Sequence, residues 1–312
     1  MEKNLFGDSI ISPKPFLKWA GGKSQLIDEI ITIFPEEIIQ SKYIENYFEP
    51  FLGGGALFFY LKSYFKIKKS YINDINPDLI LTYRVIQKYP KKLIIQLKEI
   101  KMEYLELNGE DRKEFFFKVR DDYNKKGKNF DYLSVSDESI ERAKQLIFLN
   151  KTCFNGLYRV NANGEFNVPM GKYKNPAIFE EENIKDVSKA LKNTVICNGS
   201  FEELGEFIDD NSLVYFDPPY RPLTDSASFT SYTKALFNDY NQIQLAEFCK
   251  LIDKKGSKFI LSNSDPKNAN EEDNFFDDLY ECFTIKRVPA KRMINSNGNK
   301  RGSINELLIK NF

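Results

Sequence analysis

Short apolar runs alternate with amphipathic stretches near both ends of the chain. Apolar residues recur at helical spacing from Leu26 to Phe34, and this repeat stops before Pro35. A glycine-rich turn and the helical stretch "ALFFYLK" separate the first two of several apolar or aromatic runs of strand length. Those runs occupy residues 47–51, 70–73, 194–197, 213–216 and 258–262, with a helical repeat in 240–253. Apolar strands joined by helices predict an α/β fold with a mostly parallel sheet covered on both faces.

The middle of the chain has a different pattern. Between about Arg84 and Lys174, apolar positions form one amphipathic helical stripe within residues 93–104 and another within residues 143–149. A turn-rich stretch, "NKTCFNGLYRVNANGEFNVPMGKYKNP", follows at residues 150–176. We interpret this region as a mainly helical module inserted into the α/β fold.

Composition limits the class of protein. With 312 residues, of which 42% are apolar, the chain can form one large core and an inserted subdomain. No apolar run approaches the ~20 residues of a membrane span, and the charged opening is unlike a signal peptide, so we expect a cytoplasmic protein with no membrane partner. The four cysteines lack metal-site spacing. The absence of histidine excludes Ser-His and Cys-His nucleophiles.

Charge is unevenly distributed although the formal net charge is zero. Lysine and arginine dominate residues 142–174 and 286–301, and acidic residues dominate 271–281. This segregation could give the protein one basic face that binds a polyanion and a separate acidic face. Solvated loops of mixed sign would produce the same pattern in the sequence.

Two features indicate a bound nucleoside. In "FEPFLGGGALFF" (48–59), consecutive glycines allow the backbone to pass close to a ligand, and the next helix presents free N–H groups. Asp74 follows the next strand, 21 residues after Gly53, where an acid can accept hydrogen bonds from ribose hydroxyls. Without Asp74, the glycines would indicate only a tight turn between a strand and a helix.

The segment "FLKWAGGKSQL" (16–26) contains Gly-Lys-Ser but is not a phosphate loop. That motif needs a glycine five residues before Gly22, and Leu17 stands there. What remains is Trp19, the only tryptophan, and Lys23 at the start of a helix.

The segment "SLVYFDPPYRPL" (212–223) identifies the ligand more closely. Asp217 follows a buried strand and so lies at the carboxyl edge of the sheet, where open α/β folds bind ligands. Pro218 and Pro219 lack N–H groups, and Tyr220 offers a flat ring. A carboxylate and a peptide carbonyl can accept both hydrogens of an exocyclic amine while the base stacks on the ring. Holding both hydrogens would turn the nitrogen lone pair toward an electrophile without a general base.

The motifs "FLKWAGGK", "FEPFLGGGALFF", "INDIN" and "DPPY", in this order, resemble those of the Dam-type DNA adenine-N6 methyltransferases that modify GATC. Residues 154–176 are similar to the recognition hairpin of that family. The resemblance implies a Rossmann-like methyltransferase sheet, S-adenosylmethionine as the methyl donor, no metal and a flipped-out adenine in double-stranded DNA. It assigns residues 1–83 and 176–312 to the catalytic domain and residues 84–175 to an inserted target-recognition module with a β-hairpin.

The resemblance also assigns residues to roles. Asp217, Pro218, Pro219 and Tyr220 would be catalytic. The donor would be bound by Trp19, Ala20, Gly22, Lys23, Glu49, Phe51, Gly53, Gly55, Asp74, Ser200, Phe201 and Asp217. DNA would be contacted by Lys18, Phe154, Asn155, Leu157, Arg159, Pro169 and Lys172.

Three of these DNA contacts have a specific expected role. Arg159 would read guanine, and Phe154 and Asn155 would fill the gap left by the flipped base. Lys172 departs from the family pattern, in which arginine is common, so we expect looser sequence recognition there.

Charge alone suggests phosphate contacts in the C-terminal segment, through Lys291, Arg292, Lys300 and Arg301. We expect a monomer, because one flipped base needs one site. A companion restriction endonuclease remains open. Two other classes of function also remain open: a methyltransferase acting on another planar amine, such as an RNA adenine, a cytosine N4 or a protein amide, and a noncatalytic DNA-binding module.

Overall fold

The computed structural model describes residues 11–23, 25–221, 237–291 and 303–312. Its chain divides into two compact units, and each unit is formed by three segments of the sequence. The first unit comprises residues 1–22, 53–64 and 74–199, and the second comprises 23–52, 65–73 and 200–312.

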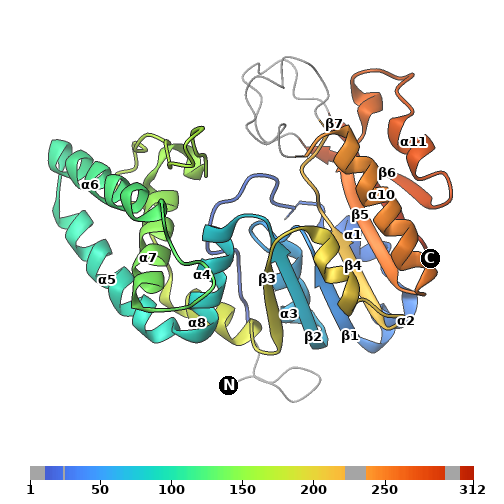
Figure 1. Ribbon diagram of the computed structural model, residues 1–312, viewed down its shortest axis with the longest axis horizontal. Coiled ribbons are helices and arrows are strands. Elements are labelled where there is room, and N and C mark those ends of the chain that lie inside the picture. The colour runs from blue at the N-terminus through green and yellow to red at the C-terminus, as the bar shows by residue number, and fades with distance from the viewer. Residues whose placement is uncertain (1–10, 24, 222–236, 292–302) are drawn as a thin grey trace. The chain divides into compact units, whose positions relative to one another are not determined.

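The first unit is mainly helical. Its helices are α3 (Ala56–Tyr64), α4 (Pro77–Lys88), α5 (Pro90–Glu106), α6 (Gly109–Gly127), α7 (Asp137–Thr152), the 3₁₀ turn η1 (Phe154–Gly156) and α8 (Glu181–Ala190), followed by strand β3 (Thr194–Asn198). Helix α7 packs against α4, α5 and α6 and is the central helix of this bundle (Figure 1). It is central because Leu146, Ile147, Phe148 and Leu149 are buried around its whole circumference.

Local sequence signals explain where these helices begin. Asn76 caps α4, since its side-chain oxygen accepts a hydrogen bond from the backbone N–H of Leu79 at 3.0 Å, and Pro77 is the first helical residue. Ser136 and Ser139 form a capping box at the start of α7. The caps fix where α4 and α7 begin, and so which of their side chains face each other.

The second unit contains a mixed sheet. Its strands are ordered β2 (Lys66–Asp74), β1 (Tyr43–Glu49), β4 (Ser212–Phe216), β5 (Lys258–Ser264), β7 (Ser303–Lys310) and β6 (Thr284–Lys291). The pairs among β2, β1, β4 and β5 are parallel, and β7 is antiparallel to both β5 and β6. Every residue of β4 is buried, as expected of a strand covered on both faces.

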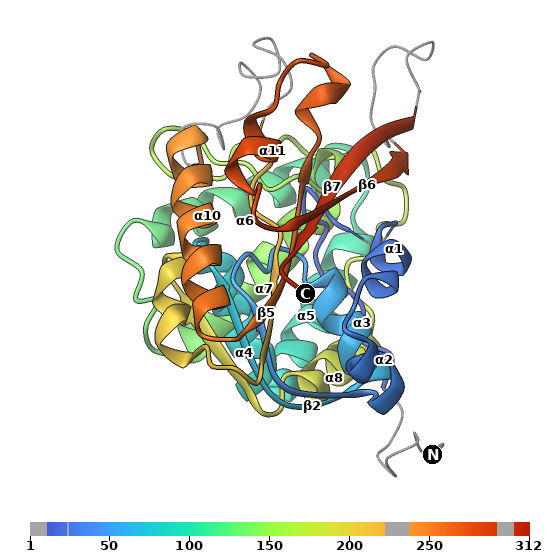
Figure 2. The ribbon, with the colours of Figure 1, turned by 90° about the vertical axis from the view of Figure 1, so that its right-hand side faces the viewer.

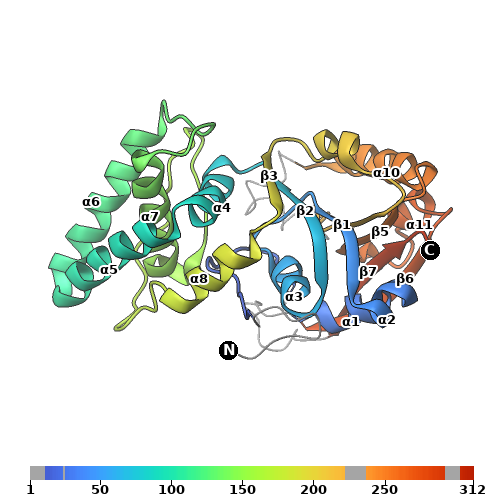
Figure 3. The ribbon, with the colours of Figure 1, turned by 90° about the horizontal axis from the view of Figure 1, so that it is seen from below.

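Helices cover both faces of this sheet. Helix α10 (Asp239–Lys254) lies on one face, and the short helices α1 (Ile27–Thr32) and α2 (Glu36–Ser41) lie on the other, as the side view and the view from below agree (Figures 2 and 3). The remaining elements are the 3₁₀ helices η2 (Phe201–Phe207) and η4 (Pro266–Asn268) and helix α11 (Phe275–Leu279). The mixed α/β fold with a mainly parallel sheet and helices on both faces is confirmed.

The order of the parallel strands indicates which edge of this sheet could bind a ligand. Strand β1 has β2 on one side and β4 on the other, so the strand order reverses between β1 and β4. The carboxyl ends of such neighbouring parallel strands are where open α/β sheets bind ligands. Here those ends lead into Phe51 and Asp217.

Some boundaries differ from those expected from the sequence. Arg84 lies inside α4, so the helical region begins at Pro77. The compact units do not follow the expected division at residues 83 and 176, and the assignment of residues 84–175 to DNA recognition stays a prediction. The charge pattern also did not predict the antiparallel pair β6–β7. Within the described ranges, no helix combines the length and the hydrophobicity needed to cross a membrane.

Candidate active site

Asp217 stands directly after β4 and has a defined set of partners. Its Oδ1 atom accepts a hydrogen bond from the hydroxyl of Ser262 at 3.1 Å and lies 3.0 Å from the ammonium of Lys23. Burial raises the pKa of the Asp217 carboxyl, while Lys23 and Ser262 act in the opposite direction. None of the described residues donates a hydrogen bond to its Oδ2 atom, so one carboxylate oxygen is available as an acceptor.

Tyr220 is partly exposed, and both its ring and its hydroxyl have partners. The ammonium of Lys23 lies 3.8 Å from the centroid of its ring, a cation–π contact. Its hydroxyl donates a hydrogen bond to Glu306 of β7. Burial, followed by the charges of Asp217 and Glu306, raises the pKa of Tyr220 well above its usual range, so the phenol stays protonated.

The two prolines between them differ in what their carbonyls do. The carbonyl of Pro219 accepts a hydrogen bond from Gln242 at 3.1 Å, and Gln242 is itself held by Asn263 at 3.1 Å. In the described part of the chain, no group donates to the carbonyl of Pro218, and its role as a second acceptor for an amine stays a prediction.

In the first unit, the glycine turn is ordered by Asp74 and Trp19. The Asp74 carboxylate accepts the N–H of Gly53 on one oxygen and the N–H of Asn76 on the other, both at 2.9 Å. Burial raises the pKa of Asp74, and these two backbone donors oppose that shift. Gly53 has a φ of +50°, and a Cβ atom there would lie 3.0 Å from Cδ1 of Trp19. A larger residue at position 53 would be strained and would press on the tryptophan.

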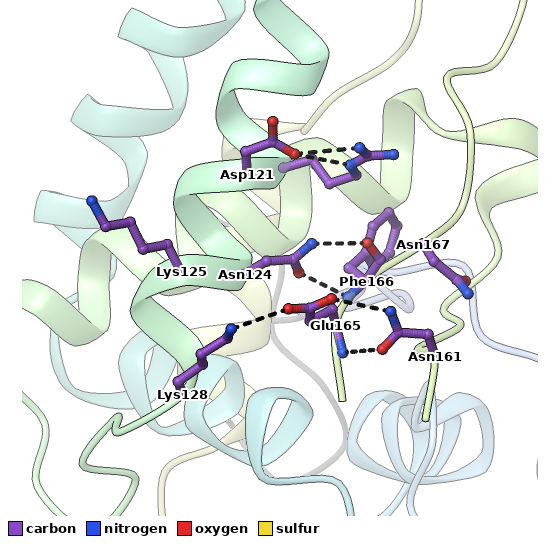
Figure 4. Close-up of a pocket in the computed structure, with 9 residues that line it drawn as sticks. Asp121, Asn124, Lys125, Lys128, Asn161, Glu165, Phe166 and Asn167 are labelled. Atoms are coloured by element: carbon purple, nitrogen blue, oxygen red, sulfur yellow. Dashed lines mark hydrogen bonds and ion pairs between the residues drawn. The ribbon is translucent and has the colours of Figure 1, made fainter. Parts of the chain in front are cut away.

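The segment expected to form a recognition hairpin takes part in two antiparallel bridges, Val160 with Phe166 and Met170 with Cys153. Arg159 is exposed, and its Nε atom donates to the side chain of Asn167 at 2.7 Å. Asn124 of α6 holds the other side of the hairpin, because its amide bonds both the N–H (2.8 Å) and the carbonyl (3.0 Å) of Phe166 (Figure 4). A pocket forms there, lined by Arg120, Asp121, Asn124, Lys125, Lys128, Asn161, Glu165, Phe166 and Asn167.

The comparison with protein families decides the identity of the chain. The model of the D12 class N6 adenine-specific DNA methyltransferases matches residues 19–294. The chain belongs to this family. This confirms the family and the class of enzyme expected from the sequence, and a DNA methyltransferase has DNA as its substrate.

Named relatives agree with this membership. The chain is 53% identical over 300 residues to "Type II methyltransferase M.MjaIII" of Methanocaldococcus jannaschii, covering 96% of this chain and 99% of that one. It is 38% identical over 316 residues to "Type II methyltransferase M1.LlaDCHI" of Lactococcus lactis subsp. cremoris, covering 99% of both chains. It is 35% identical over 301 residues to a "DNA adenine methylase" of Haemophilus influenzae, covering 95% of this chain and 92% of that one.

The donor residues expected in this methyltransferase fall in both units. Trp19, Ala20, Gly22, Gly53, Gly55 and Asp74 belong to the first unit, and Lys23, Glu49, Phe51, Ser200, Phe201 and Asp217 belong to the second. In the second unit, Phe51 packs on Phe201 with ring centroids 5.4 Å apart, and the buried Glu49 accepts a hydrogen bond from the hydroxyl of Tyr47 at 2.6 Å. Their role in donor binding stays a prediction.

The residues of this methyltransferase expected to contact DNA are largely exposed. Phe154 and Leu157 are 51% and 39% exposed. Asn155, Pro169, Lys172 and Lys18 are exposed as well. Of the expected phosphate contacts, Lys291 ends β6, while Arg292, Lys300 and Arg301 lie outside the described residues.

The acidic and basic segments near the C-terminus are partly paired with each other. Arg287, from the basic C-terminal segment, donates to Asp277 of the acidic segment and to Asp265. Arg221 pairs with Asp273 of the same acidic segment at 2.7 Å. Two acidic residues of this segment therefore neutralise nearby arginines, whereas Glu271, Glu272, Asp278 and Glu281 are exposed.

Sequence reasoning missed three residues that organise the site. Glu306 approaches Tyr220 and Lys23 from β7, and Gln242 holds Pro219 from α10. Asn150 is fully buried and joins the N-terminal motif to the hairpin, since its side chain bonds the backbone of both Lys18 (2.8 and 2.9 Å) and Gly156 (3.0 Å). Asn150 is the first residue of the turn-rich stretch, and no pattern in the sequence indicated that its side chain would be buried.

Proposed function

We propose that this family member methylates the N6 amine of adenine in GATC sites of double-stranded DNA, with S-adenosylmethionine as the donor and the adenine flipped out of the helix. The observation that supports the proposal best is the pair of available acceptors after β4. Oδ2 of Asp217 and the carbonyl of Pro218 have no donor among the described residues, whereas Oδ1 of Asp217 and the carbonyl of Pro219 are occupied.

The proposed chemistry follows from these acceptors. An exocyclic amine has two hydrogens, and each acceptor would bind one of them. The conjugated lone pair would then turn out of the plane of the base, toward the methyl group. Because Lys23 covers one face of the Tyr220 ring, we assign the opposite face to the stacked adenine. Lys23 would keep Asp217 ionised, and an ionised carboxylate is the stronger acceptor.

The residues present fit a nucleoside donor. Each oxygen of Asp74 accepts one backbone N–H and retains a lone pair that a ribose hydroxyl can use. Gly53 has no side chain, so the turn can pass close beside Trp19 at a positive φ. S-adenosylmethionine would supply a methyl group on a positively charged sulfur. The protein residues would hold and orient the donor through Trp19, Gly53 and Asp74.

Recognition of GATC is proposed from the resemblance of the hairpin and from its exposure. Arg159 presents a guanidinium group, whose fork suits the two acceptors of guanine in the major groove. Phe154 and Leu157 are exposed apolar side chains of the type that fills space in an opened base stack. Extruding the base costs a few kcal/mol, and such contacts would offset part of that cost.

The setting of the enzyme is also a proposal. We propose a monomer in the cytoplasm, where its DNA substrate is found. Two of the relatives above are named type II methyltransferases, which supports a companion restriction endonuclease for this chain.

A plasmid assay tests the function. Purified protein is incubated with plasmid and labelled donor, and the plasmid is then cut with nucleases that are blocked by, or dependent on, methylation of GATC. We expect protection by the wild type and none by Asp217→Ala. The control Asp210→Ala changes an exposed aspartate and should protect fully. Labelling of RNA or cytosine in place of GATC adenine would favour the alternative of another planar amine.

A further inference from the structure

Tyr158 connects the DNA-reading hairpin to the glycine turn of the donor site. Its ring stacks on that of Trp19, with centroids 5.0 Å apart and an angle of 24° between the planes. Trp19 belongs to the segment assigned to the donor, and Tyr158 directly precedes Arg159 in the hairpin. This contact lies entirely within the first unit.

Trp19 also lies beside the glycine turn. A Cβ atom at Gly53 would lie 3.0 Å from Cδ1 of Trp19, and one at Gly54 would lie 3.4 Å from its Cβ. The N–H of Gly53 in turn donates to Asp74. A shift of the tryptophan ring would therefore reach the turn and the carboxylate proposed to bind the ribose.

Tyr158 also contacts neighbours in the helical bundle and in the hairpin. Its hydroxyl lies 3.4 Å from Oδ2 of Asp78, and Asp78 forms a buried two-bond ion pair with Arg142 of α7. Its ring also packs edge-on against Phe166, at a centroid distance of 6.0 Å. Because Asn124 fixes Phe166 from α6, Tyr158 is positioned by both the helical bundle and the hairpin.

The hairpin gives this contact a way to respond to DNA. Successive residues of an extended segment point to opposite sides, so Arg159 projects to solvent when Tyr158 faces Trp19. If the backbone adjusts when Arg159 binds a base, the adjacent Tyr158 shifts with it. The adjustment would be transmitted to Trp19 through ring contact, since packed rings have few alternative arrangements.

We propose that Tyr158 is a positioning residue that couples DNA recognition to donor binding. Binding of the cognate site would position Trp19 beside the glycine turn and so raise the affinity for the donor. This inference rests on the proposed function. Coupling between two ligands is reciprocal, so the donor must also tighten cognate DNA by the same factor.

The test measures the affinity of an unreactive donor product, S-adenosylhomocysteine, by calorimetry with and without a GATC duplex. In the wild type we expect the duplex to tighten binding about 5-fold or more, the lower end of typical coupling. In Tyr158→Leu the ratio should fall to about 1, because the stack is lost. Tyr158→Phe keeps the ring and should keep the coupling. The control Tyr240→Leu removes an exposed tyrosine of α10 and should behave as the wild type.

A spectroscopic signature separates positioning from general damage. Trp19 is the only tryptophan, so its emission reports the stack directly. Addition of GATC duplex without donor should change the emission of the wild type and of Tyr158→Phe, and leave that of Tyr158→Leu unchanged. If Tyr158→Leu does not fold, Tyr158→Met preserves more of the buried volume and replaces it in both measurements.

The outcomes separate this inference from the proposed function. A wild type that methylates GATC plasmid but shows no coupling, or a Tyr158→Leu variant that keeps the wild-type ratio, would overturn the role of Tyr158 alone. A wild type that neither binds S-adenosylhomocysteine nor methylates GATC would overturn the proposed function itself.

Discussion

The protonation state of Asp217 should set the acidic limit of activity. An ionised carboxylate accepts the hydrogens of an amine most strongly, and burial raises the pKa of Asp217 while Lys23 lowers it. In Lys23→Met this opposing charge is gone, so the pKa rises further and the carboxylate is protonated at a higher pH. We expect the acidic limb of the kcat/KM profile to move to higher pH in Lys23→Met.

The control for this prediction is Lys254→Met, which removes an exposed lysine from the last turn of α10. Its pH profile should match that of the wild type. If the acidic limb of Lys23→Met stayed in place, ionisation of Asp217 would not limit the reaction.

Gly53 and Gly109 form a matched pair for testing the predicted role of the glycine turn in donor binding. Both have a positive φ, +50° and +48°, but only a Cβ at Gly53 would contact Trp19. An alanine at either site should cost about 1–2 kcal/mol in the free energy of unfolding, measured in urea. Only Gly53→Ala should also weaken binding of S-adenosylhomocysteine. Equal donor affinity in the two variants would remove the turn from the donor site.

The packing of α4 on α7 depends on a buried ion pair. Asp78 and Arg142 are nearly inaccessible to solvent, so Asp78→Asn would leave a buried guanidinium without its counter-charge. We expect a loss of about 3–5 kcal/mol in the free energy of unfolding. Lys92→Met removes the exposed ion pair with Asp137 and should cost less than about 1 kcal/mol. Similar losses of unfolding free energy in the two variants would mean that the buried ion pair stabilises the protein no more than the exposed one.

The hydrogen bonds from Asn124 of α6 to the hairpin should affect how well the enzyme discriminates between DNA sequences. Asn124→Ala removes both hydrogen bonds to the backbone of Phe166 and so loosens the strand opposite Arg159. Discrimination between GATC and sites with one altered base pair should fall about tenfold, which corresponds to about 1.4 kcal/mol. Methylation rates on the two duplexes give this ratio. Asn108→Ala, at the exposed start of α6, is the control and should leave the ratio unchanged.

Elements with a continuous pattern could be predicted from the sequence. The apolar run of β4 and the periodic residues of α10 are local signals, and both elements occur where expected. Strand β6 was missed because "TIKRVPAK" is rich in charge and contains a proline, features that argue against a strand. It forms because it is paired antiparallel with β7 at the edge of the sheet.

For the molecule as a whole, the motifs predicted the family but not the long-range contacts inside the site. Asp217 and Tyr220 could be singled out because four adjacent residues contain their chemistry. Glu306 could not, because it meets Tyr220 only through the pairing of β7 with β5, 86 residues farther along the chain. The stack of Tyr158 on Trp19 likewise joins positions that no local pattern relates.

A crystal structure of the enzyme with a GATC duplex and S-adenosylhomocysteine tests the central claim most directly. We predict that the target adenine lies outside the helix against Tyr220, with N6 about 3 Å from both Oδ2 of Asp217 and the carbonyl of Pro218. An adenine that remains stacked in the duplex, or whose N6 contacts neither acceptor, would contradict the account.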